Sequence, residues 1–488
     1  MDAKEVAKHN SRESCWVIIN NVVYDVTDFL DSHPGGSKII LKLAGQDATS
    51  EYDPIHPPGT LEENLTPSQI LGPIDPSTFS SPSSSTTPKS TIPTPPIPPL
   101  EEQLNIDDFA HTAERILPPK SWAYYSSASD DLITKHHNNT AYKQILLRPR
   151  IFRDVKDVDT TTTICGSPSS LPIFVAPAAM ARLAHPTGEA GIAEACGAQG
   201  VIQCVSNNAS LRPEQIVAAR KSTGQPLWFQ LYVQIERSKS EALLQRINTL
   251  GFTAIVLTLD APTPGKREAD ERVKFGGESA VSGTSGEGGG VKSATAVKSE
   301  GLGRALFAGT SPSLTWEDLK WLRSQTHLPI ILKGLQTHED AAIAASRECR
   351  ELGVTGIILS NHGGRGADTA PPPVYTLLEI RRHVPEVLRR LEVYVDGGIR
   401  RGTDVVKALC LGATAVGIGR PALFGLSGYG PEGVERVLTI LREEVETAMR
   451  LLGVNRIDEL GMQHINARAL EGLIYMPEPD NGFVRAKL

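Results

Sequence analysis

The sequence lacks three features, and each absence narrows the class of protein. No run of about 18 apolar residues occurs in the 488-residue chain, so we expect no membrane-spanning helix. The six cysteines are scattered and form no Cys-x-x-Cys pair, which favours free thiols in a reducing compartment. The first residues, MDAKEVAKHNSRESCWV, have neither the apolar core of a signal peptide nor the Arg-rich, acid-poor composition of a transit peptide. We therefore expect a cytoplasmic protein, and no nucleic-acid partner for a chain of formal net charge −7.

A Pro/Ser/Thr-rich stretch divides the chain into a small and a large part. A chain of 488 residues exceeds one hydrophobic core and allows roughly two or three domains. Between residues 72 and 100, 9 of 29 residues are Pro and 12 are Ser or Thr, a composition that cannot bury a core and stays extended. We predict a linker over 72–104 that joins a domain of residues 1–71 to a domain of residues 105–488. Residues 276–303, also of low complexity, are predicted to form a flexible loop inside the large domain.

The small domain carries two histidines in a distinctive setting. The stretch CWVIINNVVYDVTDFL predicts a β-hairpin followed by a short helix. His33 then lies in a His-Pro-Gly-Gly turn, in which Pro34 fixes its own φ and the two glycines let a flat ligand approach closely. His56 follows 23 residues later among apolar residues. Two imidazoles across an apolar slot suit the axial positions of a haem iron, whereas a zinc site would need four ligands. Taken singly, a histidine in a small domain is more often an ordinary surface or core residue, and it is the pair with its flanking residues that favours a haem site.

Eight short apolar runs alternate with helical patterns in the large domain. Such near-continuous apolar strands separated by helices predict a closed parallel (β/α)8 barrel of the TIM type, with an open doubly wound sheet as the alternative. The runs are PIFVAP (172–177), VIQCVS (201–206), LWFQLY (227–232), AIVLTLD (254–260), PIILKG (329–334), GIILSN (356–361), VYVDGG (393–398) and AVGIGR (415–420).

Acidic, basic and cationic side chains follow these runs, at the strand ends that build the active site of such a barrel. The side chains at these strand ends that could bind a ligand or take part in a reaction are Gln230, Tyr232, Thr258, Asp260, Lys333, His362 and Arg365. The last two runs end in the glycine-rich turns DGGIRRG and GIGR, where Arg400 and Arg420 accompany free backbone N–H groups. Turns at these two strands commonly hold phosphate, so a phosphorylated cofactor is predicted. The alternative is that they are ordinary glycine turns.

Both parts resemble known families. Residues 4–71 resemble cytochrome b5 in the His-Pro-Gly-Gly turn and in the spacing to the second histidine, which implies a small α+β domain that binds haem b through His33 and His56. Residues 105 to about 475 resemble the FMN-dependent 2-hydroxy-acid-oxidising family. The motifs that carry this resemblance occur in order and are WAYYSS, APAAMARLAHPTGE, FQLYV, LDAPTPGKRE, SNHGGR, VDGGIRRGTDVVKALCLGA and GIGRP.

The resemblance implies a role for each matching residue. Tyr124 and Arg365 bind the substrate carboxylate, and Tyr232 contacts the substrate hydroxyl. His362 is the general base that Asp260 orients, and Lys333 stabilises negative charge on the flavin. The residues implied to hold the FMN ring are Ala176, Pro177, Ala178, Ser206, Gln230 and Thr258. Those implied to hold its phosphate are Asp396, Gly397, Gly398, Arg400, Gly419 and Arg420.

Asn208 departs from the family pattern. It stands where members carry an aromatic or aliphatic residue beside the substrate's side chain, so an amide there predicts a preference for 2-hydroxy acids with polar or longer side chains. The resemblance otherwise implies oxidation of an L-2-hydroxy acid, L-lactate to pyruvate. Electrons would pass through the haem to cytochrome c or a similar acceptor.

The alternatives are an oxidase that passes electrons to oxygen or takes another hydroxy acid, and an electron-transfer haem module with an inactive barrel. The resemblance also implies a homotetramer, with the mitochondrial intermembrane space as an alternative location. Residues 1–71 contain 5 Lys or Arg against 11 Asp or Glu, so the predicted haem domain is acidic. An acidic face is either simply solvated or attracts a basic partner.

Overall fold

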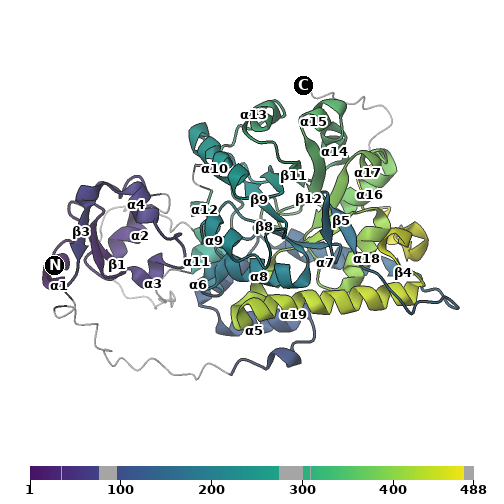
Figure 1. Cartoon of the computed structure of the whole chain (residues 1–488), viewed down its shortest axis with the longest axis horizontal. Helices are drawn as coiled ribbons and strands as arrows, with labels where there is room; N and C mark the ends of the chain where they lie inside the picture. Colours follow the sequence, from purple (N-terminus) through teal and green to yellow (C-terminus); the bar gives the residue numbers. More distant parts are fainter. Residues whose placement is uncertain (34–35, 76–77, 79–95, 274–300, 308, 477–488) are drawn as a thin grey trace, which may run out of the picture.

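The computed structural model describes residues 1–33, 36–75, 78, 96–273, 301–307 and 309–476. Residues 276–300 of the predicted loop and most of the predicted linker lie outside these ranges, as do Pro34 and Gly35. The described residues form a small N-terminal lobe and a large barrel, which are the purple part and the blue-to-yellow part of Figure 1. All six cysteines lie in the described ranges and are free thiols. Within these ranges, no helix has both the length and the apolar character to cross a bilayer.

The small lobe is a three-stranded antiparallel sheet with short helices. Its strands are β1 (Trp16–Ile19), β2 (Val22–Asp25) and β3 (Ile70–Pro73), with β2 in the centre. Asn20 and Asn21 connect β1 to β2 and have φ values of 50° and 62°. This is the backbone of the predicted two-residue hairpin turn, which is therefore confirmed. The helices of the lobe are α1 (Ala3–Val6), α2 (Ser37–Lys42), α3 (Thr49–Tyr52) and α4 (Thr60–Asn64).

The eight predicted runs form the eight strands of a closed barrel. The strands pair in parallel in the order β7-β8-β9-β10-β11-β12-β13-β14, and β14 pairs back to β7. The predicted barrel is thus confirmed and the open-sheet alternative is wrong. The bounds are β7 (Ile173–Val175), β8 (Ile202–Val205), β9 (Leu227–Leu231), β10 (Ala254–Thr258), β11 (Ile330–Leu335), β12 (Val354–Leu359), β13 (Glu392–Asp396) and β14 (Ala415–Ile418).

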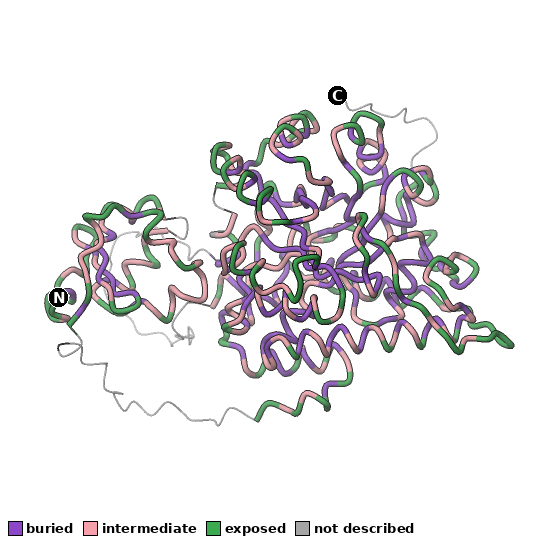
Figure 2. Tube along the Cα trace, in the orientation of Figure 1, coloured by how far each residue is buried: buried purple, intermediate pink, exposed green. Residues whose placement is uncertain are grey.

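Side chains fill the inside of the barrel. Phe174, Trp228 and Tyr394 pack against one another there with ring centroids 5.1 to 5.8 Å apart, and all three are fully buried. Ile164 joins the same cluster from the hairpin of β5 (Thr162–Ile164) and β6 (Ser167–Ser169). Most residues of the eight strands are accordingly buried (Figure 2). A packed interior leaves the strand ends as the place for a ligand.

Helices surround the barrel and connect its strands. Three precede β7, namely α5 (Ile106–Ile116), α6 (Pro119–Ser126) and α7 (Ile133–Lys143). The others are α8 (Gly188–Gln199), α9 (Pro213–Ala218), α10 (Arg237–Thr249), α11 (Glu268–Arg272), α12 (Leu302–Ala305), α13 (Asp318–Gln325), α14 (His338–Ala344), α15 (Arg347–Glu351), α16 (Pro373–His383), α17 (Val387–Arg390), α18 (Gly402–Leu411) and α19 (Arg420–Leu452). Helix α19 is kinked at Gly430, which precedes Pro431 and has a φ of 62°.

Candidate haem site and active site

The two predicted haem ligands face each other in the small lobe. The ring centroids of His33 and His56 lie 6.1 Å apart. Two metal–imidazole bonds of about 2 Å each, with the two ring radii, span a similar distance. The Nδ1–H of His33 donates to the carbonyl oxygen of Gly36 at 3.3 Å, and that of His56 donates to Tyr52 at 3.1 Å. These bonds fix the tautomer and leave each Nε2 to bind a metal, so the pair fits a haem iron.

Aromatic rings flank the histidine pair. Tyr52 stacks on His56 with ring centroids 4.2 Å apart, and the ring centroid of Phe29 lies 5.9 Å from that of His33. Burial lowers the pKa of His33 and lowers that of His56 to about 4. Both imidazoles are therefore neutral at pH 7, which is the protonation state that binds iron.

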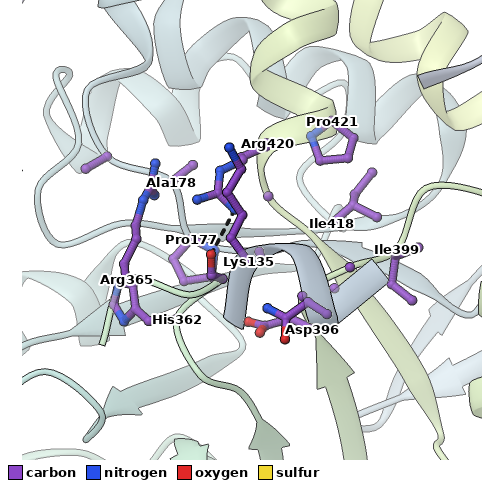
Figure 3. Close-up of a pocket in the computed structure, with 18 of the residues that line it drawn as sticks. Lys135, Pro177, Ala178, His362, Arg365, Asp396, Ile399, Ile418, Arg420 and Pro421 are labelled. Atoms are coloured by element: carbon purple, nitrogen blue, oxygen red, sulfur yellow. Dashed lines mark hydrogen bonds between the residues drawn. The ribbon is translucent and has the colours of Figure 1, made fainter. Parts of the chain in front are cut away.

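A cavity of about 420 Å³ opens at the carboxyl ends of the barrel strands (Figure 3). It brings together every predicted barrel-site residue except Asp260, which lies behind His362. The predicted residues that line it are Tyr124, Ala176, Pro177, Ala178, Ser206, Asn208, Gln230, Tyr232, Thr258, Lys333, His362, Arg365, Asp396, Gly397, Gly398, Arg400, Gly419 and Arg420.

His362 and Asp260 form a hydrogen-bonded pair at this cavity. The Nδ1–H of His362 donates to Oδ1 of Asp260 at 2.8 Å, and the Asp260 side chain is fully buried. The Nε2 of His362 lies 3.4 Å from the hydroxyl of Tyr232. Burial is the main cause that lowers the pKa of His362, while Asp260 acts in the opposite direction. A neutral imidazole with its tautomer fixed by a carboxylate is suited to accept a proton at Nε2.

Lys333 supplies a buried positive charge next to this pair. Its Nζ donates to Oγ of Ser360 at 3.0 Å and lies 3.5 Å from Asp260 and 3.7 Å from Asp396. Burial alone would lower the pKa of Lys333, but Asp260 and Asp396 raise it above its ordinary value. The amine therefore stays protonated although only 4% of the residue is exposed.

Two arginines, Arg365 and Arg267, line the cavity close to each other. One nitrogen of Arg365 donates to the carbonyl oxygens of Tyr124 (3.1 Å) and Tyr125 (2.8 Å), which anchors the guanidinium on one side. Sequence reasoning missed Arg267, a buried arginine that lines the same cavity. Its position in the quoted motif LDAPTPGKRE, just after β10, was the available signal. Burial, followed by the charge of Arg267, lowers the pKa of Arg365 to about 10, so an anion here would relieve the repulsion.

Unpaired polar atoms around the cavity fit the predicted FMN. Within the described residues, six buried side-chain atoms of the cavity lining have no hydrogen-bond partner. Two are the Nε atoms of Arg267 and Arg365, and four belong to residues predicted to hold FMN, namely Nε2 of Gln230, Oγ1 of Thr258, Oδ1 of Asp396 and one terminal nitrogen of Arg400. Gly397 and Gly398 both have φ values of 85°, and a Cβ on Gly398 would collide with the carbonyl oxygen of Asn138. A polar cofactor would supply hydrogen-bond partners for the four atoms of the predicted FMN residues. The two glycines leave room for it that a residue with a side chain would not leave.

The cationic end of the cavity contains the predicted Arg400 and Arg420 and one further cation, Lys135. The Arg420 guanidinium donates to the carbonyl oxygens of Tyr125, Ser127 and Gly363, at 2.8 to 3.0 Å, so its side chain is already bound within the protein. Sequence reasoning missed Lys135 on α7, which Figure 3 draws at the cavity. Burial, with the charges of Arg420, Arg400 and Arg365, lowers the pKa of Lys135 to about 8. A phosphate would neutralise part of this cluster.

Asn208 lies at the cavity, but its amide is bound within the protein. The Nδ2–H donates to the carbonyl oxygen of Leu306 at 3.2 Å, and Oδ1 accepts from Asn207 at 3.1 Å. The predicted direct contact of this amide with substrate stays a prediction.

Known proteins share both parts of the chain. Residues 113–467 match the family described as FMN-dependent dehydrogenase, and residues 2–75 match the cytochrome b5-like heme/steroid binding domain. The L-lactate dehydrogenase (cytochrome) of Wickerhamomyces anomalus is 41% identical over 95% of this chain and 79% of its own length. The protein of that description from Saccharomyces cerevisiae is 42% identical over 93% of this chain and 78% of its own. Spinach glycolate oxidase is 40% identical, over 75% and 96% respectively.

Solved structures agree with these matches. A flavocytochrome b2 variant with pyruvate bound aligns with a TM-score of 0.68 and 39% identity, over 79% of this chain and 91% of its own. A mandelate oxidase variant with (S)-mandelic acid aligns with a TM-score of 0.62 and 35% identity, over 74% and 98%. The predicted resemblances, and with them the predicted cofactors FMN and haem b, are confirmed. This chain belongs to the FMN-dependent dehydrogenase family, with a cytochrome b5-like domain in front of its barrel.

Proposed function

We propose that the protein oxidises a small L-2-hydroxy acid, L-lactate to pyruvate, and passes the electrons singly through the haem to cytochrome c. The observation that carries this proposal is the arrangement of His362 with Asp260 at one cavity with Arg365 and Arg267. A 2-hydroxy acid offers a carboxylate for the arginines and a proton for the base. The relatives named L-lactate dehydrogenase (cytochrome) favour lactate among such acids.

Each side chain has its own role in the proposed reaction. Arg365, with Tyr124 and Arg267, binds the substrate carboxylate and orients the molecule. Nε2 of His362 accepts the substrate proton, and Asp260 stabilises the imidazolium that results. Lys333 stabilises the negative charge that develops at the flavin end of the cavity. FMN, when bound, supplies the two-electron acceptor, and haem supplies the one-electron carrier.

Contacts between the two lobes support electron transfer from the barrel to the haem domain. The guanidinium of Arg212 lies 2.7 Å from the carboxylate of Glu63, and Arg182 donates to the carbonyl oxygen of Asp53. Ile55, next to the haem-ligand candidate His56, packs against the hydrophobic core of the barrel body. These contacts put the face of the lobe that carries His56 against the barrel.

Two alternatives remain distinct from this proposal. An oxidase would pass electrons to oxygen with the haem domain playing no part, and an inactive barrel would leave only the haem module. The pairing of His362 with Asp260 and the charged Lys333 argue against the inactive barrel. The contacts between the lobes favour the dehydrogenase over the oxidase.

Anaerobic mixing with L-lactate, followed by visible absorbance, separates the three functions. The dehydrogenase should bleach the flavin band and then develop the reduced haem bands, and D-lactate serves as the control. Flavin bleaching without haem reduction would indicate the oxidase, and no change in either chromophore would indicate the inactive barrel. The homotetramer and the location, cytoplasm or mitochondrial intermembrane space, also stay part of the proposal.

A further inference from the structure

A short segment that begins at Gly301 contributes an aromatic ring to the cavity. We call residues 301–307 and 309–311 the α12 segment. Leu306 and Phe307 of this segment both line the cavity. The ring centroid of Phe307 lies 5.2 Å from that of Tyr232 and 6.3 Å from that of His362. Phe307 therefore lies beside His362, the base of the proposed function, and beside Tyr232, which is predicted to contact the substrate hydroxyl.

Both ends of the α12 segment are fastened to the barrel. At its start, the backbone N–H of Gly303 donates to Asp270 at 2.8 Å, and the buried Asp270 pairs with Lys120 at 2.7 Å. At its other end, the N–H of Ser311 donates to the carbonyl oxygen of Val233 at 2.8 Å. These bonds fix the two ends of the α12 segment against the barrel. The position of the Phe307 ring depends on the contacts of the residues between these ends.

Asn208 binds the α12 segment between its two ends. Its Nδ2–H donates to the carbonyl oxygen of Leu306, the residue before Phe307, at 3.2 Å. The amide is itself fixed, because Oδ1 accepts from Asn207 at 3.1 Å and the backbone N–H donates to Ser206 at 3.2 Å. An amide satisfied in this way leaves no polar atom that must be paired by the substrate. The apolar surface offered to the substrate at this point then comes from Leu306 and Phe307, and only the Phe307 ring lies beside Tyr232 and His362 in the ring contacts of the described residues.

We propose that Asn208 is a positioning residue that clasps Leu306 and so holds the Phe307 ring against the substrate's side chain. This inference rests on the proposed oxidation of a 2-hydroxy acid, whose carboxylate lies at Arg365 and whose reacting carbon lies at His362. With both ends of the substrate fixed, the Phe307 ring limits the room for the side chain. Acids with a small apolar side chain, such as lactate, are selected over acids with a bulky one.

A double-mutant cycle tests whether Asn208 acts through Phe307. The variants are Asn208→Asp, which keeps the shape but removes the donor, Phe307→Ala, and the two combined. The measured quantity is the ratio of kcat/KM for L-lactate to that for L-mandelate, in which a phenyl ring replaces the methyl group. Retained FMN absorbance verifies that each variant is folded and loaded.

Each single variant should lower the ratio by about tenfold, in line with pocket changes of this size, and the double variant should match Phe307→Ala. The change should appear mainly in KM, because His362 and Asp260 are unaltered. Asn248→Asp is the matched control, since Nδ2 of Asn248 also donates to a backbone carbonyl, that of Gln325 at 2.8 Å, away from the cavity. Its ratio should equal that of the wild type.

Two results would overturn the inference while leaving the proposed function intact. If Asn208→Asp lowers the ratio as strongly in the Phe307→Ala background as in the wild type, Asn208 contacts the substrate directly. If Asn208→Asp leaves the ratio unchanged, the hydrogen bond from Asn208 to Leu306 does not control selectivity. Failure of every 2-hydroxy acid to reduce the wild-type flavin would instead overturn the proposed function, and the inference with it.

Discussion

At the scale of single residues, Asp260 sets the charges around the base. Burial alone would raise its pKa, but Lys333 and His362 lower it to about 2. Asp260 is therefore ionised at every physiological pH, and its charge is offset by Lys333 at 3.5 Å. Next to this fixed pair, the buried His362 stays neutral and takes up a positive charge only when it accepts a proton.

The first prediction removes the base. His362→Gln should slow flavin reduction by about 10²- to 10⁴-fold, which is the typical contribution of a general base. Substrate affinity should change little, because Arg365 and Tyr124 still bind the carboxylate. Stopped-flow flavin bleaching gives the rate, and its dependence on lactate concentration gives the affinity. A variant that reduces flavin at nearly the wild-type rate would rule out His362 as the base.

The second prediction concerns pH. Because burial lowers the pKa of His362 below the ordinary value of about 6.5, kcat/KM should stay level on acidification to that pH and fall only below it. Protonation removes the base, so the loss lies on the acid side. Asp260→Asn should shift this limb to still lower pH, because Asp260 raises the pKa of His362. An acid limb that moves upward in Asp260→Asn would contradict the assignment.

At the scale of elements, the strands and the hairpin turn of the small lobe could be predicted because their signals are local. Each barrel strand is a short apolar run bounded by polar or glycine residues, and all eight runs are strands in the structure. The hairpin turn at Asn20 and Asn21 also follows from two adjacent residues that tolerate positive φ. Such patterns need no knowledge of what packs against them.

The features of the cavity that the sequence did not predict depend on contacts between distant parts of the chain. Lys135 reaches the cavity from α7, which precedes the barrel strands, and no local pattern distinguishes it from a surface lysine. The bond from Asn208 to Leu306 joins residues 98 positions apart. Sequence alone marked Asn208 as unusual, but only the fold supplies the carbonyl oxygen that its amide binds.

The third prediction concerns the haem turn as an element. His33→Ala and His56→Ala should each lose haem, because one axial ligand is missing, while lactate still reduces the flavin in the separate barrel. The haem absorbance band and the flavin bleaching rate are the two measurements. His9→Ala is the control, since His9 lies in the same lobe and stacks on Trp16, and no imidazole of the described residues faces it. Loss of flavin reduction in a folded, FMN-loaded His33→Ala protein would show that the lobes are not independent.

At the scale of the whole molecule, charge is unevenly distributed. The formal net charge of the chain is −7, and residues 1–71 carry 11 acidic against 5 basic side chains. One of these acids, Glu63, pairs with Arg212 of the barrel. In the proposed electron route, the acidic lobe contacts the barrel on one side and would meet the acceptor on another.

The fourth prediction concerns the ion pair between Glu63 of the small lobe and Arg212 of the barrel. Glu63→Arg should slow haem reduction but not flavin reduction, because it places two cations together at the contact. Combining it with Arg212→Glu should restore most of the rate. The effect should be only a few-fold, since both side chains are partly exposed and such pairs are weak. Equal haem reduction in the single and double variants would show that this pair does not guide the contact.

The last prediction concerns the acceptor. A basic cytochrome c approaching an acidic lobe is attracted over a distance comparable to the Debye length, about 10 Å at 0.1 M salt and about 3 Å at 1 M. Reduction of cytochrome c should therefore slow as salt is raised. Flavin reduction by lactate should not slow, because its charged groups are buried in the cavity. Stopped-flow measurements of both steps across a salt series test this directly, and ferricyanide, an anionic acceptor, serves as the control because screening should speed its reduction. If cytochrome c reduction is as insensitive to salt as flavin reduction, the acidic lobe does not steer the acceptor, and its charge only keeps the surface solvated.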